Sequence, residues 1–403
     1  MDLRLYLQPL EKKAEAMVDQ IMQWSNINSH SYNIPGLKKM ANVLTEAFSV
    51  LECQSETHPL LPLDHINSLG LPEKMPLGSM LRFWKRPAAP IQVLLIGHMD
   101  TVFETTSSFQ TAIRTSKGLI HGPGVTDMKG GLCVMLEALK TFEQSDHNQQ
   151  LGWEVIINPD EELGSFSSAP LFEERAKFHQ VGLLFEPAMD EKGTLAGDRK
   201  GSGNFTVIVR GRAAHAGRAF SEGRNAIVEC AKVIVQIDAL NGQREGVTIN
   251  VGHMQGGGSV NVVPELAICH LDIRILKMED GPWVEEKLRS IVAAAQQTDG
   301  YKVELIGKMN RKPKTLKGKT QALYDLVAEI GKELGEVITW KPSGGCCDGN
   351  NLSAVGLPNI DTLGVCGGNI HSPEEYCLIE SLVPRAKLTA AILLRLSEGK
   401  FTG

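Results

Sequence analysis

The stretch that decides the fold lies between residues 91 and 159, and it contains IQVLLIG at 91–97, MKGGLCVMLEALKTFE at 128–143 and WEVIINP at 153–159. The first and third segments are short and nearly continuously apolar, which is typical of strands buried on both faces of a parallel or mixed sheet. The middle segment has the length and pattern of the crossover helix that parallel strands require. These three segments predict an α/β domain.

The α/β pattern extends to both sides of this stretch. Another apolar run, VGLLFEP at 181–187, predicts a further buried strand, and residues 8–24 repeat apolar side chains every three or four positions, which predicts a helix. Toward the C-terminus, helices are expected near 321–334 and 381–396, with the Gly-rich loop SGGCCDGNN between them. We therefore expect residues 1–198 and 313–403 to form one domain, with a mixed sheet flanked by helices.

Residues 199–312 show a different order of predicted strands and helices. The segments NFTVIVRG, EGRNAIVECAKVIVQIDAL, VTINVGHM, LAICHLDIRIL, PWVEEKLRSIVAAAQQ and YKVELIG read in order as β-α-β-β-α-β. That order is the split βαβ or ferredoxin-like arrangement. The sequence therefore predicts a smaller α+β domain inserted into the larger α/β domain.

Composition excludes several classes of protein. The 403 residues carry 41 Lys and Arg against 47 Asp and Glu, a net charge of -6, so nucleic acid is not an expected partner. No segment approaches the roughly 18 apolar residues of a membrane-spanning helix, and the first residues lack the pattern of a secretory signal. The eight cysteines are scattered and form no CxxC pair. We expect a soluble, cytoplasmic protein with reduced thiols.

Acidic residues and histidines gather where the predicted strands end. In α/β sheets, ligands bind beyond the carboxyl ends of the strands. The residues that follow the three apolar runs, precede the crossover helix or lie in the C-terminal loop are His98, Asp100, Asp160, Glu161, Glu162, Glu186, Asp127 and His371. Carboxylates crowded together repel one another, and a divalent cation is the usual compensation. The sequence therefore predicts a metal site at this edge of the sheet.

Spacing divides these residues by role. His98 and Asp100 lie two apart at a strand end and share a face, so Asp100 can accept the second imidazole N–H and would orient His98 rather than bind metal. Glu161 and Glu162 are adjacent and point to different sides, which suits one metal ligand beside one general base. Two histidines and at least three carboxylates exceed the needs of a single tetrahedral zinc, so a two-metal site with a bridging carboxylate fits better.

Each of these motifs has an ordinary structural explanation when it is taken alone. A histidine after a strand is commonly a capping or core residue, a run such as DEE commonly lies in a solvated loop, and GPG commonly forms a turn. What favours a metal site is that all of them are expected at the same edge of one sheet.

The motifs also resemble a known family. GHMDTVF at 97–103, GPGVTDMKGG at 122–131, NPDEELGS at 158–165, FEPA at 185–188 and IHSPEEY at 370–376 are similar to the motifs of the two-zinc metallopeptidases. These include glutamate carboxypeptidases of the carboxypeptidase G type, acetylornithine deacetylase and succinyl-diaminopimelate desuccinylase. The resemblance covers nearly the whole chain. It implies a zinc-exopeptidase-like catalytic domain with an inserted lid and dimerisation domain.

The resemblance also implies roles for individual residues. Asp127 would bridge two Zn²⁺ ions, with His98 and Glu186 completing one site and Glu162 and His371 completing the other. Glu161 would be the general base, and the peptide bond between Asp127 and Met128 would be cis. Since nitrogen and oxygen ligands also accept Co²⁺ or Mn²⁺, the native metal stays open.

In the inserted domain, three further residues match positions with known roles in the family. His215, in GRAAHAGRAF, would reach the active site of a partner subunit in a homodimer and stabilise the oxyanion. Asn261 and Arg274 would bind the substrate carboxylate or help to close the lid, and Arg is a natural bidentate partner of a carboxylate. Without the resemblance, His215 reads as a loop hydrogen-bonder and Arg274 as a surface charge.

The chain departs from the family at one motif. Relatives commonly carry Gly-Gly-Ser/Thr-Asp before the final histidine, whereas this chain has Cys346 and Cys347 before Asp348. Cys347 stands where relatives have a hydroxyl, so either substrate specificity differs, or the site is sensitive to oxidation, or a small residue simply fits a tight loop.

The expected activity is metal-dependent hydrolysis of the amide bond of an N-acyl amino acid or peptide with a free carboxylate. A glutamate carboxypeptidase is favoured, because LAGDRKGSGNFTVIVRGRAAHAG and GGGSVNVVP look most like that branch. An acetylornithine deacetylase or succinyl-diaminopimelate desuccinylase is the alternative. A catalytically inactive metal-binding homologue is the alternative from another class.

Overall fold

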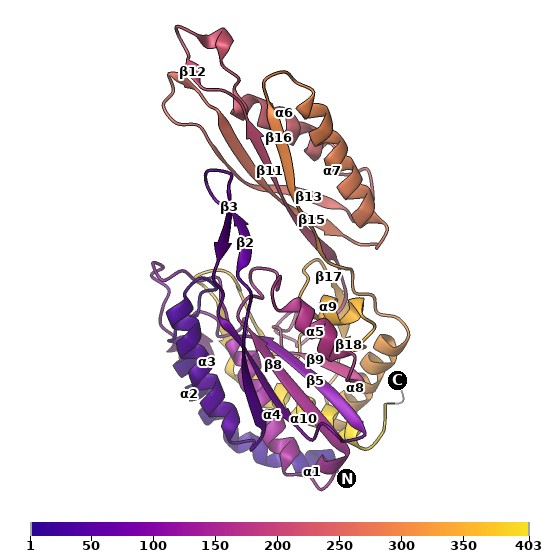
Figure 1. The fold of residues 1–403 in the computed structure, drawn as a ribbon. Coiled ribbons are helices and arrows are strands. Elements are labelled where there is room, and N and C mark those ends of the chain that lie inside the picture. Colours follow the sequence, from indigo (N-terminus) through magenta and orange to yellow (C-terminus); the bar gives the residue numbers. More distant parts are fainter. Residues whose placement is uncertain (1, 402–403) are drawn as a thin grey trace.

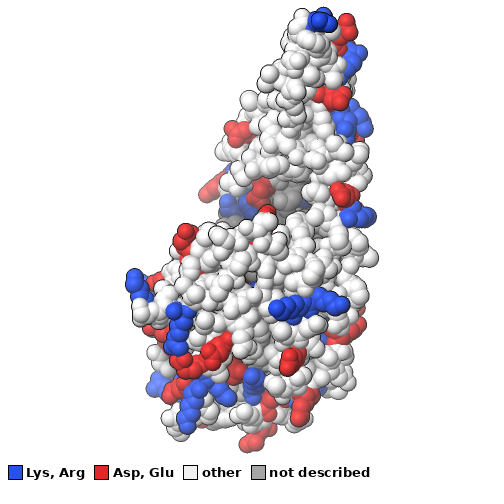
Figure 2. Space-filling view, turned by 90° about the vertical axis from the view of Figure 1, so that its left-hand side faces the viewer, with Lys and Arg blue, Asp and Glu red and all other residues white. Residues whose placement is uncertain are grey.

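The computed structural model describes residues 2–401 and consists of a broad α/β part and a narrow α+β part that extends from it (Figures 1 and 2). The chain enters the narrow part after β10 (Leu195–Arg199) and leaves it after β16 (Lys302–Arg311). Each part has its own buried apolar cluster. The arrangement agrees with an insertion, while the exact boundaries at 199 and 312 stay a prediction.

The broad part contains a six-stranded mixed sheet. Its strands, in spatial order, are β1 (Gln54–Pro59), β4 (Ser79–Lys85), β8 (Leu151–Asn158), β5 (Ile91–His98), β9 (Val181–Leu184) and β18 (Asn359–Ile360). β8, β5, β9 and β18 are parallel, whereas β1 and β4 run antiparallel to their neighbours. The predicted mixed sheet is confirmed, and its central strands are the apolar runs of the sequence.

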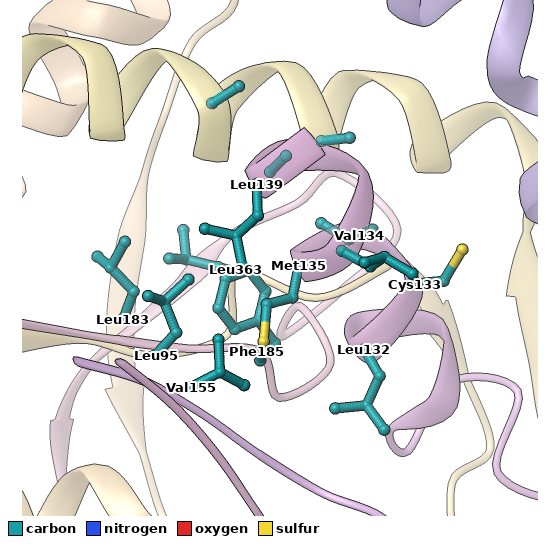
Figure 3. Packing of buried hydrophobic residues seen from close by; sticks show 14 of the residues in the cluster. Leu95, Leu132, Cys133, Val134, Met135, Leu139, Val155, Leu183, Phe185 and Leu363 are labelled. Atoms are coloured by element: carbon teal, nitrogen blue, oxygen red, sulfur yellow. The ribbon is translucent and has the colours of Figure 1, made fainter. Parts of the chain in front are cut away.

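Helices cover both faces of this sheet. Successive strand side chains point to opposite faces, so Val93 and Leu95 join one apolar cluster and Leu94 and Ile96 the other. The first face packs against α2 (Ala14–Ser25), α3 (Ile34–Ser49), α4 (Lys129–Glu143), α8 (Lys319–Leu334) and α10 (Ile379–Ser397), and the second against α5 (Ala169–Ala176) and α9 (Asp348–Ala354). Figure 3 shows α4 between the sheet and α10, with Leu139 and Met135 directed toward the strands.

The predicted N-terminal helix differs from the observed one. Residues 8–24 were expected to be a single α-helix, but a short α1 (Leu3–Leu7) and a 3₁₀ segment, Gln8–Lys13, precede α2. Pro9 stands in the first turn of the 3₁₀ segment and lacks the N–H that an α-helix would use. The apolar periodicity was therefore correct for burial but not for the type of helix.

The narrow part is a four-stranded antiparallel sheet in the order β13-β15-β11-β16. Its elements are β11 (Gly201–Arg210), α6 (Ala226–Asp238), β13 (Thr248–Gly256), β15 (Leu266–Ile275), α7 (Asp280–Gln296) and β16. The buried side of the sheet packs against α6 and α7. This is the predicted ferredoxin-like arrangement, because the two central strands are the first and third of the β-α-β-β-α-β order.

A hairpin from the broad part touches the narrow part. β2 (Leu63–Ile66) and β3 (Pro72–Met75) rise toward the inserted sheet (Figure 1), and Arg210 Nη2 donates to the carbonyl oxygens of Gly70 at 2.8 Å and Leu69 at 3.3 Å. Gly70 has a φ of +70° and lies close to the Arg210 guanidinium, so a residue with a side chain would be strained there. This hairpin is a second connection between the parts besides the crossing strands.

Small strands hold the loops at the edge of the main sheet. β6 (Ile113–Arg114), β7 (Leu119–His121), β20 (Tyr376–Leu378) and β19 (Gly367–Gly368) form one small sheet, and β10 pairs with β17 (Trp340–Ser343). The loop after β7 carries Asp127, and the loop between β19 and β20 carries His371. The small sheet therefore brings two predicted ligands from distant segments to one place. None of the described helices is long and apolar enough to cross a membrane.

The close packing of α4 predicts the effect of one substitution. A Cβ on Gly131 would lie 2.0 Å from the carbonyl oxygen of Phe185, directly before Glu186. We expect Gly131→Ala to push α4 from the end of β9 and to lower the free energy of unfolding by about 3 kcal/mol. Chemical denaturation measures this change.

Gly281→Ala is the matched control, because Gly281 is also helical but its Cβ would meet atoms only at 3.5 Å and 3.6 Å. That variant should be neutral or up to about 1 kcal/mol more stable. Equal effects of the two substitutions would contradict the packing argument.

Candidate metal centre

The structure brings the five predicted metal ligands together at the carboxyl edge of the main sheet. His98 is the last residue of β5, Glu162 follows β8, and Glu186 follows β9. Asp127 lies in the turn before α4, and His371 lies between β19 and β20. His98 is 1% exposed and Asp127 7%, so the centre of the cluster is buried.

The carboxylate of Asp127 lies between the two histidines. Its Oδ1 is 3.1 Å from His98 Nε2, and its Oδ2 is 3.3 Å from His371 Nε2. Glu162 Oε2 is 3.3 Å from His371 Nε2, while Glu186 Oε2 is 3.9 Å from His98 Nε2. The peptide bond between Asp127 and Met128 is cis, as the family resemblance implied.

These separations fit a pair of metal ions. Ligand atoms placed 2.0–2.1 Å from a tetrahedral zinc lie about 3.3 Å from one another. Two groups of donors lie within 4.8 Å of one another: His98, Asp127 and Glu162 form one, and His98, Glu161 and Glu186 form the other. Imidazole nitrogens with carboxylate oxygens suit zinc and also cobalt or manganese.

The pKa shifts in the cluster show that it attracts positive charge. Burial raises the pKa of Glu162 to about 8, and the nearby charge of Asp127 adds to that effect. Burial and the charge of Glu161 likewise raise the pKa of Glu186 well above its usual value. Without a metal, protons on these carboxyl groups relieve the repulsion that a divalent cation would otherwise relieve.

The pKa values of the two histidines are also shifted in the direction that favours positive charge. Hydrogen bonds with Asp127 and Glu162 raise the pKa of His371 to about 11. Burial alone would lower the pKa of His98, but hydrogen bonds with Asp100 and Asp127 outweigh burial and raise it. Both imidazoles therefore favour their protonated forms, and a metal would replace those protons.

Asp100 organises the neighbouring turn as well as His98. Its Oδ1 and Oδ2 accept the backbone N–H groups of Glu161 and Glu162, each at 3.2 Å, and Oδ2 also accepts the Ser31 hydroxyl at 2.8 Å. His98 Nδ1 is 3.0 Å from the Asp100 carbonyl oxygen and 3.4 Å from Oδ1 of its side chain. The closest contact of the imidazole is thus with the backbone, although the spacing predicted the side chain.

Glu375 anchors the loop that carries Asp127, a role that the sequence reasoning missed. This fully buried carboxylate accepts the backbone N–H groups of Gly124, Thr126 and Asp127 at 2.8–3.0 Å. Its only signal in the sequence is its place four residues after His371 in the motif IHSPEEY. Burial and the charge of Asp127 raise the pKa of Glu375 to about 7.

The cluster opens into a pocket of about 570 Å³ between the two parts of the molecule, where acidic and basic side chains meet in the hollow of Figure 2. Arg274, Arg311 and Arg199 line this pocket. Arg274 was predicted, but Arg311 and Arg199 were not. Arg311 is the last residue of β16, and Arg199 is the last residue of β10, just before the inserted sheet. Basic residues are common at such strand ends on the surface, so no pattern distinguished these two.

His215 and Asn261 lie far from the cluster within this chain. His215 is in β12 (Ala214–His215), which pairs with β14 (Val262–Val263) at the outer end of the inserted part (Figure 1). Asn261 lies beside it, because its carbonyl oxygen accepts the N–H of Ala216 at 2.9 Å. Both residues are exposed, and neither lines the pocket.

The two adjacent cysteines have different surroundings. Cys346 lines the pocket, with its Sγ 2.9 Å from Arg274 Nη1. Cys347 is 2% exposed and caps α9, since its Sγ accepts the N–H of Gly349 at 3.3 Å. A sulfur at position 347 therefore does the capping that a hydroxyl does in many helices. All eight cysteines lie among the described residues and are free thiols.

Comparison with known proteins agrees with this geometry. Residues 94–395 match the model of peptidase family M20/M25/M40. The chain belongs to this family. It is a metal-dependent amidohydrolase or exopeptidase, and the resemblance found in the motifs is confirmed.

Individual relatives support the assignment. Carboxypeptidase G2 of Pseudomonas sp. (strain RS-16) is 30% identical over 314 residues, which cover 76% of this chain and 74% of that protein. Succinyl-diaminopimelate desuccinylase of Hahella chejuensis is 24% identical over 328 residues, covering 76% and 83%. A dinuclear metal-binding M20 peptidase of Bacillus subtilis has the same fold, with a TM-score of 0.65 and 13% identity over 96% of this chain and 99% of that one.

The shared position of Asp127 predicts the metal content of two variants. We expect the purified protein to bind about two zinc ions per chain. His371→Ala should lose about one of them, and Asp127→Ala should lose both, because its two oxygens face different histidines. Elemental analysis after gel filtration measures the ratio.

Zinc should also raise the melting temperature of chelator-treated protein, because a ligand at one hundred times its Kd stabilises by about 2.7 kcal/mol. His58→Ala, in the exposed strand β1, is the control and should keep both ions. Two ions retained by Asp127→Ala would refute the bridging arrangement.

Proposed function

We propose that this chain hydrolyses the amide bond between an acyl group and an amino acid with a free carboxylate, in the manner of a glutamate carboxypeptidase. The observation that carries the proposal is the pocket, which is lined both by residues of the histidine and carboxylate cluster and by Arg274 of the inserted sheet. A substrate that spans it would present its amide to the cluster and its carboxylate to a guanidinium.

The proposed roles follow from the positions of the side chains. His98, Asp127, Glu162, Glu186 and His371 would hold two Zn²⁺ ions, or Co²⁺ or Mn²⁺ in their place. Such ions polarise a carbonyl and make water easier to deprotonate near neutral pH. Glu161 would accept the proton of the attacking water and deliver it to the departing amine. Asp100 would keep His98 and the turn of Glu161 in place through its contacts.

Arg274 is placed so that it could exchange its present hydrogen-bond acceptor, Asp272, for a substrate carboxylate. Its Nε and Nη2 donate to the carboxylate of Asp272 at 2.7 Å and 2.8 Å, and its side chain is 31% exposed. The third nitrogen, Nη1, contacts Cys346 Sγ at 2.9 Å, so a substrate carboxylate in the pocket would take the place of Cys346 or of Asp272. Asn261 would assist in holding this carboxylate.

A second copy of the chain would supply His215 and Asn261. The strand β11 has ten residues, so the inserted sheet is about 33 Å long at 3.3 Å per residue. Arg274 and Ser202 pair at the inner end of this sheet, whereas β12 lies at the outer end. His215 cannot cross that distance to its own pocket while the sheet stays folded. We therefore propose a homodimer, formed through the inserted domain, in which His215 stabilises the oxyanion of the partner's reaction.

Two other functions compete with this one. The relatives include a desuccinylase, so an acetylornithine deacetylase or succinyl-diaminopimelate desuccinylase activity is the second candidate. A metal-binding homologue without activity is the third.

We also propose that the protein is cytoplasmic. The eight free thiols support this location, because disulfides are rare in the cytosol.

Replacing the proposed base tests the reaction. Glu161→Gln should lower kcat by about 10²- to 10⁴-fold, the contribution typical of general acid–base catalysis, and should keep its two metal ions. Steady-state kinetics and elemental analysis measure the two quantities. Glu374→Gln, the same change at an exposed position near His371, should be fully active. Full activity of Glu161→Gln would refute the assignment of the base.

A substrate panel distinguishes the candidates. Release of glutamate from N-acyl-glutamates should exceed hydrolysis of acetylornithine and of succinyl-diaminopimelate, and chelation should abolish it until zinc is restored. Exclusive turnover of acetylornithine would favour the second candidate. Absence of turnover from the metal-loaded protein on the whole panel would favour the third.

A further inference from the structure

Arg311 reaches from the inserted sheet into the catalytic part of the chain. It is the last residue of β16 and pairs with Ser202, at the point where the two parts meet. Its side chain is 5% exposed, which is rare for arginine unless the charge is paired. The guanidinium must therefore find its partners inside the protein.

Those partners are the proposed base, Glu161, and two further acceptors. Nη2 of Arg311 donates to Glu161 Oε1 at 2.8 Å, to the hydroxyl of Ser165 at 2.9 Å and to Asp348 Oδ1 at 3.1 Å. Ser165 and Glu161 belong to the turn after β8, and Asp348 begins α9. A single nitrogen from the inserted part thus joins the turn after β8, through Glu161 and Ser165, to the start of α9, through Asp348.

The carboxylate of Glu161 lies between this guanidinium and the metal ligands. A carboxylate oxygen of Glu161 is within 4.8 Å of ligand atoms of His98 and Glu186, and Oε1 accepts the bond from Arg311. A charge-assisted bond to one oxygen restricts rotation of the carboxylate. Its orientation toward the cluster is therefore set by Arg311 and by the backbone bonds of the turn to Asp100.

The surroundings of Arg311 differ from those of Arg274. Arg274 is paired with a neighbour on its own strand and is partly open to the pocket, so it can exchange that neighbour for substrate. Arg311 also lines the pocket, but its side chain is buried against its acceptors, and among residues 2–401 its Nε has no hydrogen-bond partner. A buried donor without a partner costs roughly 1–3 kcal/mol, so the side chain is held in this position against a local penalty.

We propose that Arg311 is a positioning residue for the general base: it holds the carboxylate of Glu161 in its orientation toward the metal ligands and ties that orientation to the inserted sheet. This inference rests on the proposed function, in which Glu161 is the base. It assigns Arg311 a role distinct from binding the substrate carboxylate, which belongs to Arg274. Arg274 and Arg311 both belong to the inserted sheet. The same sheet therefore positions the residue that binds the substrate carboxylate and the residue that orients the base.

A double-mutant cycle tests the proposal. Arg311→Met should lower kcat by about 10- to 100-fold and change KM by less than about threefold, because the interaction acts on the base. In the Glu161→Gln background, Arg311→Met should lower the residual kcat/KM by less than about threefold, since the group that it positions is already disabled. The metal content of all variants should stay at that of the parent protein.

Substrate affinity provides a second readout that does not depend on turnover. In the Glu161→Gln background, calorimetry with an N-acyl-glutamate should give the same Kd, within about threefold, with and without Arg311→Met. Arg274→Met in that background is the contrast, and it should raise Kd by at least about tenfold, or 1.4 kcal/mol. A tenfold rise in Kd for Arg311→Met would overturn the proposal and make Arg311 a carboxylate-binding residue.

The remaining outcomes are also decisive. Equal losses from Arg311→Met in both backgrounds would overturn the positioning role while leaving Glu161 as the base. Full activity of Glu161→Gln alone would overturn the proposed function, and this inference with it. If Arg311→Met does not fold, Arg311→Lys keeps the charge and should lower kcat with little change in KM, whereas a change in KM alone would contradict the proposal.

Discussion

The repulsion among carboxylates buried at one edge of a sheet is the constraint on which the rest of this structure depends. Asp100, Asp127, Glu162, Glu186 and Glu375 lie within a few residues of the carboxyl ends of β5, β8 and β9 or of the small sheet beside them. The protein compensates these charges in two ways. Backbone N–H groups donate hydrogen bonds to two acids that organise the loops, two to Asp100 and three to Glu375, although burial still raises the pKa of Glu375 to about 7. The carboxylates that face the histidines accept no backbone N–H bond among the described residues, so protons or metal ions would have to compensate their charge.

This division depends on how closely the scaffold brings its segments together. Parallel strands place their carboxyl ends at one edge, but two of the five predicted ligands, Asp127 and His371, come from loops outside the main sheet. The small sheet of β6, β7, β20 and β19 supplies the loops of Asp127 and His371, and Glu375 fixes the first loop by hydrogen bonds. Helix α4 then approaches the end of β9 so closely that only glycine fits at position 131. The separation between Asp127 and Glu186 is thus determined by backbone contacts, which a flexible surface site would lack.

The sequence was informative where an apolar run, which predicts a buried strand, is followed directly by histidines or acidic residues. Apolar runs that end in His98, Glu162 and Glu186 revealed both the sheet and its edge, and the β-α-β-β-α-β order revealed the inserted part. Arg311 could not be found in this way, because a basic residue at the polar end of a strand shows the same sequence pattern whether its side chain turns to solvent or into the protein. The hairpin of β2 and β3 was missed for a related reason, since its residues are mostly exposed and show no alternation of burial. Asp100 was correctly placed beside His98, but its bonds to the turn of Glu161 join segments sixty residues apart, which no local pattern encodes.

Arg274 and Arg311 lie at one end of the inserted sheet, next to the pocket, whereas β12 lies at its other end. Arg274 pairs with Ser202, and Ser202 pairs with Arg311, so both guanidiniums stand at the inner end of the sheet. A rotation about this end displaces them little, whereas a tip about 33 Å away moves by about 6 Å for each ten degrees. The groups that must keep their distance from the metal ligands therefore lie near the axis. His215 and Asn261, which the proposed homodimer would bring to the partner's site, lie where such a displacement would be greatest. The same sheet would thus keep the proposed base in place even if its outer end moved.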